Sequence, residues 1–395
     1  MTTHEHRTAD ILVIGAGVMG ASIAFHLAGR KAGRVLVVDK ARVGQGQSGR
    51  SSGLIRMHYT FPPEVQLALC SLDAFRHWRD VVGRPGDFRT IEFVRIVAPR
   101  DTPSLMANVD MQRALGVNTR LISPEELHEI EPEWNVDDVG AAAYEADAGY
   151  SDGAGVAQDY LDRARELGTD YSPNTRVTAL RVEGERLVGI DTDRGAVDAS
   201  RVIVATGPWT APLLLPVGFK APIESIYHEV VLLKHAQAPR GRNCACIDSG
   251  VGVYFRPDAP GFTLLGSFEG HGGADPDEFP QSASQDSLGE LVEAAARRAP
   301  VLADAGIARS ITGIYDVTPD SRALLGAVPG VDGLYMAAGF SGMGFKIAPA
   351  VGLTMAELLT EGRATTVDIT PFRPSRFMEG KPIQAAHEYT AYTAR

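Results

Sequence analysis

A glycine-rich turn between two apolar runs, close to the start of the chain, most constrains its fold. The first run is Ile11–Ile14, the turn reads Gly-Ala-Gly-Val-Met-Gly over residues 15–20, and the second run, Val35–Val38, ends at Asp39. A short continuous apolar run is typical of a buried parallel strand, and glycines at the first, third and sixth positions typically open a helix. The spacing therefore predicts a β-α-β unit of an α/β domain whose turn binds a dinucleotide.

Each glycine of the turn meets a separate physical need. Gly15 makes the tight turn, Gly17 lets the backbone approach a pyrophosphate, and Gly20 lets the helix pack closely on the strand. The helix N-terminus supplies N–H groups and partial positive charge to the phosphates. Asp39, about 20 residues further on, is placed to accept a hydrogen bond from a ribose hydroxyl.

Composition excludes several classes of partner. The net charge of −11 argues against nucleic acid or an anionic membrane surface. The three cysteines, Cys70, Cys244 and Cys246, fit neither a disulfide framework nor a metal site, so we expect free thiols and no metal. The start of the chain lacks a cationic leader, and three glycines interrupt the apolar stretch 11–27. We therefore expect a cytoplasmic protein with no membrane segment.

Two later segments separate FAD from NAD as the cofactor. The strand 201–205 ends in Thr-Gly-Pro-Trp, and residues 337–344 form a second strand–glycine–helix element, followed by a predicted helix over 348–359. A helix N-terminus there would face the flavin and stabilise negative charge on its reduced form. A simple doubly wound NAD enzyme has no use for this element, so FAD is the predicted cofactor.

The remaining pattern predicts a second, β-rich unit. Short strands are expected over 176–198 as a meander, and longer ones between 223 and 268 in a mainly antiparallel sheet. The periodicity predicts helices over 62–82 and 287–298. The polar residues 379–395 are expected to form a tail of low order.

Five motifs carry a resemblance to a known family. They are GAGVMG at 15–20, VVDK at 37–40, SGRSSGLIR at 48–56, VATGPW at 204–209 and AAGFSGMGFKIAPAVG at 337–352. Together they resemble the D-amino-acid oxidase superfamily of FAD enzymes, in particular its sarcosine oxidase and glycine oxidase branch. The likeness extends from Asp10 to Phe372.

The resemblance implies an α/β fold with two parts. One is a discontinuous Rossmann-like FAD-binding domain of the glutathione-reductase and p-hydroxybenzoate-hydroxylase type, over 1–88, 140–215 and 317–378. The other is a mainly antiparallel β-sheet substrate domain, over 89–139 and 216–316. The residues expected to contact FAD are Gly15, Ala16, Gly17, Val18, Met19, Gly20, Asp39, Lys40, Gln47, Ser48, Arg50, Ser51, Ser52, Gly53, Leu54, Arg176, Val177, Ala205, Thr206, Gly207, Trp209, Gly339, Gly342, Met343, Gly344, Phe345 and Lys346.

Three side chains are candidates for the catalytic site. Arg56 and Lys346 match positions that clamp the substrate carboxylate in the sarcosine oxidase branch, and Tyr254 resembles a pocket tyrosine. A guanidinium and an ammonium group suit a carboxylate. The alternatives are a surface cation for Arg56, a residue of the helix start for Lys346 and a core aromatic for Tyr254.

Departures from the branch shape the expected chemistry. Gly313 stands near the place of the cysteine that attaches flavin in monomeric sarcosine oxidases, which implies non-covalent FAD. The strand 262–266 lacks the lysine that promotes reaction with oxygen, so the electron acceptor is oxygen or another molecule.

The resemblance predicts oxidation of a C–N bond in an amino acid or N-alkyl amino acid, giving an imine. Oxidation of a 2-hydroxy acid is one alternative. The other is a flavin-bearing subunit of a sarcosine-oxidase-like complex. The chain would accordingly be a monomer, a homodimer or a subunit, with a small carboxylated amine as its substrate.

Overall fold

The computed structural model describes residues 7–268 and 270–390. Its α-helices are α1 (Val18–Gly29), α2 (Pro62–Arg76), α3 (Trp78–Val82), α4 (Thr102–Ala114), α5 (Pro124–Ile130), α6 (Gly153–Glu166), α7 (Thr210–Leu214), α8 (Gln285–Arg298) and α9 (Gly344–Glu361). Short 3-10 helices are η1 (Gln47–Arg50), η2 (Pro99–Asp101), η3 (Gly207–Trp209), η4 (Leu215–Val217), η5 (Pro300–Asp304), η6 (Thr370–Phe372) and η7 (Pro374–Phe377).

The strands form four sheets. They are β1 (Arg7–Ala9), β2 (Ile11–Ile14), β3 (Val35–Val38), β4 (Leu54–Ile55), β5 (Arg89–Thr90), β6 (Phe93–Val97), β7 (Thr119–Ile122), β8 (Ala141–Glu145), β9 (Gly149–Tyr150), β10 (Asp170–Ser172), β11 (Val177–Glu183), β12 (Arg186–Thr192), β13 (Gly195–Ala199), β14 (Val202–Val204), β15 (Glu224–Lys234), β16 (Ala245–Asp248), β17 (Val253–Pro257), β18 (Phe262–Ser267), β19 (Gly306–Val317), β20 (Leu324–Ala327) and β21 (Leu334–Ala338).

A six-stranded sheet, in the order β10-β3-β2-β14-β21-β20, contains the predicted β-α-β unit. All its pairings are parallel except the one between β20 and β21. The close helix–strand packing predicted for Gly20 is confirmed, because a Cβ there would lie 1.8 Å from the carbonyl oxygen of Gly15. Helix α9 packs against α1, where a Cβ on Gly352 would lie 2.0 Å from Ser22 Oγ.

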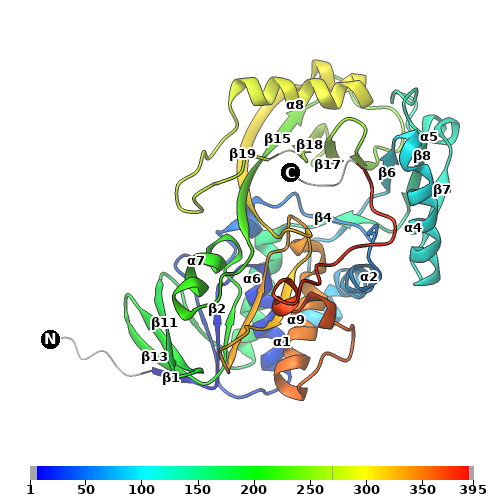
Figure 1. Ribbon diagram of the computed structural model, residues 1–395. Helices are drawn as coiled ribbons and strands as arrows, with labels where there is room; N and C mark the ends of the chain where they lie inside the picture. The colour runs from blue at the N-terminus through cyan, green and yellow to red at the C-terminus, as the bar shows by residue number, and fades with distance from the viewer. Residues whose placement is uncertain (1–6, 269, 391–395) are drawn as a thin grey trace.

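An eight-stranded sheet forms the other half of the molecule, in the order β19-β15-β18-β17-β16-β6-β8-β7. It is antiparallel except where β16 runs parallel to β6. Figure 1 shows α8 lying across the outer side of this sheet, away from the six-stranded one. Strand β8 belongs here, although the sequence assignment places residues 140–215 in the FAD-binding part. The predicted meander is present as β11–β13, which β1 joins as a fourth, parallel strand.

Two predicted helices differ from the structure in extent, and one strand is missing from the sequence prediction. The predicted helix 62–82 is interrupted at His77, which separates α2 from α3. Helix α9 begins at Gly344 rather than at 348, because Pro349 is accommodated within the helix. The four-residue strand β16 is not predicted at all. No helix among the described residues is long and apolar enough to cross a membrane.

The expectation of a tail of low order is wrong for residues 379–390. This segment runs from the six-stranded sheet up to β6 and α4, as Figure 1 shows in red. Tyr389 is 3% exposed, and Ile383 packs against the main core. The remaining residues of the predicted tail, 391–395, lie outside the described part of the chain.

Candidate functional site

A cavity of about 640 Å³ lies beside the glycine turn, at the C-terminal ends of β2, β3 and β14. This is the edge at which ligands bind in open α/β sheets. The residues expected to contact FAD that line it are Gly15, Gly17, Val18, Met19, Asp39, Lys40, Gln47, Ser48, Arg50, Ser51, Ser52, Leu54, Arg176, Val177, Ala205, Thr206, Gly207, Trp209, Gly342, Gly344, Phe345 and Lys346. The structure therefore brings most of the predicted cofactor residues to one cavity.

Five of the expected contact residues do not line this cavity, and they support it instead. The Ala16 N–H donates to Asp39 Oδ2 (2.6 Å), and the Gly339 N–H donates to Asp316 Oδ2 (2.6 Å). Gly20 allows α1 to pack on its strand. Gly53, with a positive φ of 66°, leads into β4, and Met343 lines a smaller neighbouring cavity.

The phosphate end of the cavity fits the predicted dinucleotide. Helix α1 begins there at Gly17, which has no side chain to cap it, and no acidic residue lies in its first turn. Ser48 Oγ accepts the Val18 N–H at 2.9 Å, and no carboxylate of the first turn offsets the positive end of the helix. Gly207 faces open space, since a Cβ there would meet no atom within 4 Å. Asp39 accepts one hydrogen bond at each carboxylate oxygen, from the N–H groups of Ala16 and Ala41. Each oxygen keeps a lone pair for a ribose hydroxyl.

The flavin end is built by a second helix start. Helix α9 begins at the cavity, again with no side-chain cap and no acidic residue in its first turn. The Gln47 side chain accepts a hydrogen bond from the Ile314 N–H (2.7 Å), and Arg50 donates to the Thr312 carbonyl (2.7 Å), so η1 is tied to β19. Gly313, between those two residues, also lines the cavity. None of the described lining residues is cysteine or histidine, which agrees with non-covalent FAD.

An ionic cluster lies at the rim of the main cavity, and the sequence analysis did not predict it. Lys40 Nζ lies 3.8 Å from the centre of the Trp209 ring and 2.5 Å from Asp277 Oδ1, which also accepts a hydrogen bond from the Trp209 indole (3.0 Å). The hydrogen bond from Lys40 is the main factor that lowers the pKa of Asp277. No sequence pattern marks Asp277, which comes from the loop between β18 and α8.

Lys346 lines the main cavity in the first turn of α9 and is 8% exposed. Burial lowers its pKa well below the ordinary lysine value, and the charge of Arg56 lowers it further, while Glu64 opposes the change. A carboxylate arriving beside this side chain would stabilise its charged form. Lys346 is thus a buried amine in the cavity wall whose charged form is disfavoured as long as no anion lies beside it.

Arg56 follows β4 directly and faces a second cavity of about 30 Å³, rather than the main one. The residues lining this smaller cavity are Arg56, His58, Tyr59, Thr60, Arg95, Ile247, Arg322, Met343 and Tyr389. Three of these residues are arginines, and we therefore call this small cavity the arginine-lined end of the site. The charge of Arg56 lowers the pKa of Lys346, although the two side chains line different cavities.

His58 and Arg95 are side chains of this region that the sequence analysis missed. His58 is 4% exposed, and burial lowers its pKa well below the usual value, with further lowering by Arg95 and Arg56. Arg95 is 2% exposed on β6. His58 follows the SGRSSGLIR motif closely in sequence, and this proximity could have indicated that it belongs to the site. Nothing in the sequence around Arg95 distinguishes it from an ordinary strand residue.

Tyr254 lines neither cavity. Its ring lies over Gly266 of the adjacent strand β18, where a Cβ would come within 2.3 Å of a ring carbon. Burial raises the pKa of its hydroxyl. Its position favours the alternative of a core aromatic over a catalytic residue.

Asp316 is a buried carboxyl group in the wall of the main cavity that the sequence analysis did not single out. Burial raises its pKa to about 6, against the effect of backbone N–H groups including that of Gly339. The neighbouring Tyr315 stacks on His228 at a ring separation of 4.0 Å. These residues place a weakly acidic group and an aromatic pair beside the flavin end.

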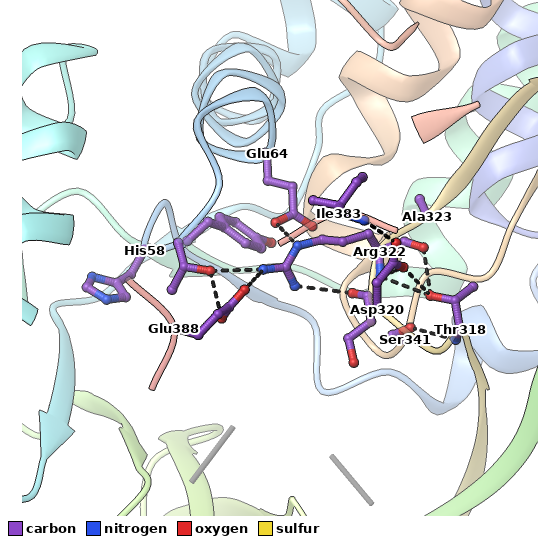
Figure 2. A network of polar contacts seen from close by, with 12 residues as sticks. His58, Glu64, Thr318, Asp320, Arg322, Ala323, Ser341, Ile383 and Glu388 are labelled. Atoms are coloured by element: carbon purple, nitrogen blue, oxygen red, sulfur yellow. Dashed lines mark hydrogen bonds and ion pairs between the residues drawn. The ribbon is translucent and has the colours of Figure 1, made fainter. Parts of the chain in front are cut away.

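A network of ion pairs and hydrogen bonds holds several chain segments together beside the arginine-lined end. Asp320 pairs with the fully buried Arg376 at 2.8 Å and also accepts the Ile383 N–H at 2.9 Å. Figure 2 shows Arg322 lying between Glu64 and Glu388. Its Nε is 3.0 Å from Glu64 Oε2, and its Nη2 is 2.9 Å from Glu388 Oε1. The network connects α2, the turn before β20 and the C-terminal segment.

Comparisons with known proteins agree with this architecture. Residues 10–358 match the family described as FAD dependent oxidoreductase (DAO). The chain is 30% identical to the mouse protein "FAD-dependent oxidoreductase domain-containing protein 1" over 95% of its own length and 86% of that protein. It is 27% identical to the sarcosine oxidase beta subunit of Rhodobacter capsulatus, over 95% and 90% of the two chains.

A solved structure gives the same result. L-proline dehydrogenase from P. horikoshii superimposes with a TM-score of 0.88 at 28% identity, over 96% of this chain and all of that one. The family match spans most of the sequence, and the main cavity fits the cofactor. The protein is therefore an FAD-dependent oxidoreductase of the DAO family.

Proposed function

We propose that this enzyme oxidises the C–N bond of an amino acid or N-alkyl amino acid whose carboxylate binds between Lys346 and Arg56. The observation that carries the proposal is Lys346, a buried amine in the wall of the main cavity at the start of α9. Burial lowers its pKa, and a carboxylate beside it would favour its charged form. Arg56 and Arg95 are also buried and line the smaller neighbouring cavity.

Two carboxyl groups nearby are only weakly acidic. Burial raises the pKa of Glu64 to about 7, despite the nearby Arg322, and burial raises that of Glu145 to about 7 as well. Near neutral pH both groups therefore spend much of the time protonated. A substrate carboxylate would bring a full negative charge to this region, and ionic hydrogen bonds to a guanidinium are strong and directional.

The protein's part in the reaction is positioning and electrostatics. FAD bound in the main cavity supplies a hydride acceptor. Lys346 and Arg56 would hold the carboxylate and so fix the amine carbon beside the start of α9. The amine would react as the neutral base, so the site needs no strong general base. The imine product would leave and be hydrolysed by water.

The names of related proteins support this substrate class. Besides sarcosine oxidase and L-proline dehydrogenase, the chain resembles glycine oxidase from Geobacillus kaustophilus, with a TM-score of 0.81 at 25% identity. All three names refer to small amino acids with a free carboxylate. Likeness to a beta subunit also favours a second candidate, in which this chain is the flavin-bearing part of a larger complex.

The rate of flavin reduction as a function of pH tests the proposal against 2-hydroxy-acid oxidation. The holoenzyme would be mixed anaerobically with matched pairs, such as alanine with lactate and glycine with glycolate. An amine substrate gives a rate that rises as its ammonium group loses a proton, and a hydroxy acid lacks that dependence. Reduction only by the hydroxy acids would overturn the C–N assignment. Inactivity of the isolated chain, combined with activity in a larger assembly, would favour the subunit.

A further inference from the structure

We infer that a loop of the eight-stranded half closes the FAD cavity and has to move aside when the cofactor enters or leaves. The loop comprises residues 275–281, between β18 and α8, and we call it the cofactor loop. It belongs to the part of the chain that the sequence analysis assigns to the substrate domain. The inference concerns retention of the cofactor, so it goes beyond the proposed function and does not depend on the identity of the substrate.

The cofactor loop forms part of the wall of the main cavity. Pro276, Asp277 and Phe279 line this cavity, and so do Lys40 and Trp209 of the FAD-binding half. Figure 1 shows the segment before α8, in yellow, extending from the eight-stranded sheet towards α7. The two halves of the molecule therefore meet at the rim of the cavity, and the loop is the contribution of the eight-stranded half.

Asp277 anchors the loop to the FAD-binding half. Its Oδ1 lies 2.5 Å from Lys40 Nζ and accepts a hydrogen bond from the Trp209 indole at 3.0 Å. Its Oδ2 lies 3.9 Å from Arg176 Nη1. The sequence analysis expects all three partners to contact FAD. One carboxylate of the loop thus holds three side chains of the predicted cofactor site in place.

A second anchor lies at the other end of the loop. Gln281 Oε1 accepts a hydrogen bond from Arg50 Nη2 at 2.6 Å, and Gln281 Nε2 donates to the Phe279 carbonyl at 3.0 Å. The guanidinium carbon of Arg50 lies 5.3 Å from the centre of the Phe279 ring. Arg50 belongs to η1, in the motif expected to bind FAD. Both ends of the loop are therefore held by residues of the predicted cofactor site.

These anchors are weak enough for the loop to open. The side chain of Asp277 is 50% exposed, and that of Lys40 is 27% exposed. Ion pairs at such exposure contribute little to stability, because water and salt screen the charges. Residues 275–281 contain no helix or strand, so moving them breaks no sheet pairing. The loop can thus keep FAD in the cavity and still let it pass.

The rate at which the holoenzyme releases FAD tests this inference. The holoenzyme would be diluted until released FAD does not rebind, and the rise in flavin fluorescence would be recorded without substrate. In Asp277→Ala we expect release about five- to twentyfold faster than in the wild type, because the loop loses its contacts to three side chains. Gln281→Ala should speed release about two- to fivefold. The control Glu278→Ala, at an exposed position of the same loop, should release FAD like the wild type.

The salt dependence of release separates loss of the ionic anchor from a general loosening of the structure. Added KCl should speed release from the wild type and from Gln281→Ala, whereas Asp277→Ala should respond much less. Asp277→Asn keeps an acceptor for the Trp209 indole and loses the charge, so its release rate should be intermediate.

Three results would each overturn the role of the cofactor loop. They are unchanged release in Asp277→Ala, faster release in only one of the two anchor variants, and equal acceleration by Glu278→Ala. Far-UV circular dichroism equal to that of the wild type would show that the variants fold. Because no substrate is present, none of these results bears on the proposed oxidation of an amine.

Discussion

Replacement of Glu145 by glutamine should change how the stability of this protein depends on pH. Glu145 is fully buried on β8, where its Oε2 accepts the Met57 N–H at 3.0 Å and its Oε1 has no hydrogen-bond partner. Burial raises its pKa to about 7, from a model-compound value of 4.5, although the Met57 N–H and Arg56 favour the charged form. The folded protein thus holds a proton that the unfolded chain releases.

The sign and size of the effect follow from that difference. Between pH 4.5 and 7 the folded state binds more protons than the unfolded state, so the free energy of unfolding falls as the pH rises. One pKa unit corresponds to about 1.4 kcal/mol, which gives a loss of about 3 kcal/mol over the whole window. Glutamine keeps an oxygen for the Met57 N–H and carries no charge. Glu145→Gln should therefore unfold like the wild type near pH 5 and be more stable by about 3 kcal/mol at pH 8.

Urea titrations at pH 5 and pH 8, followed by tryptophan fluorescence, would measure this difference. Glu129→Gln is the matched control, because Glu129 is exposed on α5. The control should give the same change between the two pH values as the wild type. If Glu145→Gln also behaves like the wild type at both pH values, burial does not raise the pKa of Glu145, and the reasoning about its neighbour Arg56 fails with it.

Three further substitutions test other parts of the account. Lys346→Met should weaken binding of a monocarboxylate to the holoenzyme by about ten- to a hundredfold, because the carboxylate loses a charged partner. The control Lys220→Met, at an exposed lysine, should leave the affinity unchanged. Equal affinities in the two variants would show that Lys346 is not part of the carboxylate site. Gly20→Ala forces α1 away from its strand and should lower both the melting temperature and the ratio of flavin to protein, at a cost of about 1–3 kcal/mol. Gly29→Ala, in the same helix with no atom within 4 Å of the added Cβ, should lower neither quantity, because alanine favours a helix more than glycine does. A similar loss in the two variants would refute the packing argument. Asp248→Asn removes the buried partner charge of Arg298, now 2.5 Å from Asp248 Oδ2, and leaves only the exposed Asp138 at 2.8 Å, so it should cost about 3 kcal/mol. Glu166→Gln, at the more exposed pair with Arg84, should cost less than about 1 kcal/mol, and urea unfolding would measure both.

The parts of this structure that follow from local sequence were predictable. The glycine turn at residues 15–20 fixes strand, turn and helix within one short stretch, so β2, α1 and β3 could be predicted from their own residues. The start of α9 could not be predicted as well, because Pro349 indicates a helix start four residues later than the observed one.

The parts that depend on distant contacts were not predictable. The C-terminal segment 381–390 carries no periodic pattern, and its anchors Asp101, Asn108 and Asp320 lie far from it in sequence. Arg95 lies in a strand where a lone charge usually marks a solvent-facing position, and only the fold shows that it is buried against Tyr389. For the same reason the motif that contains Arg56 gave no indication that a second cavity adjoins the flavin site.

Anaerobic mixing of the purified yellow protein with small amino acids tests the central claim most directly. The flavin absorbance would be followed with sarcosine, proline, glycine, and D- and L-alanine. At least one of these amines should bleach the flavin band of the wild type. The same amine with its carboxylate blocked as an amide should bleach it far more slowly. Equal bleaching by the free acid and its amide would contradict the carboxylate site formed by Lys346 and Arg56, and bleaching by none of the amines would contradict the proposed reaction.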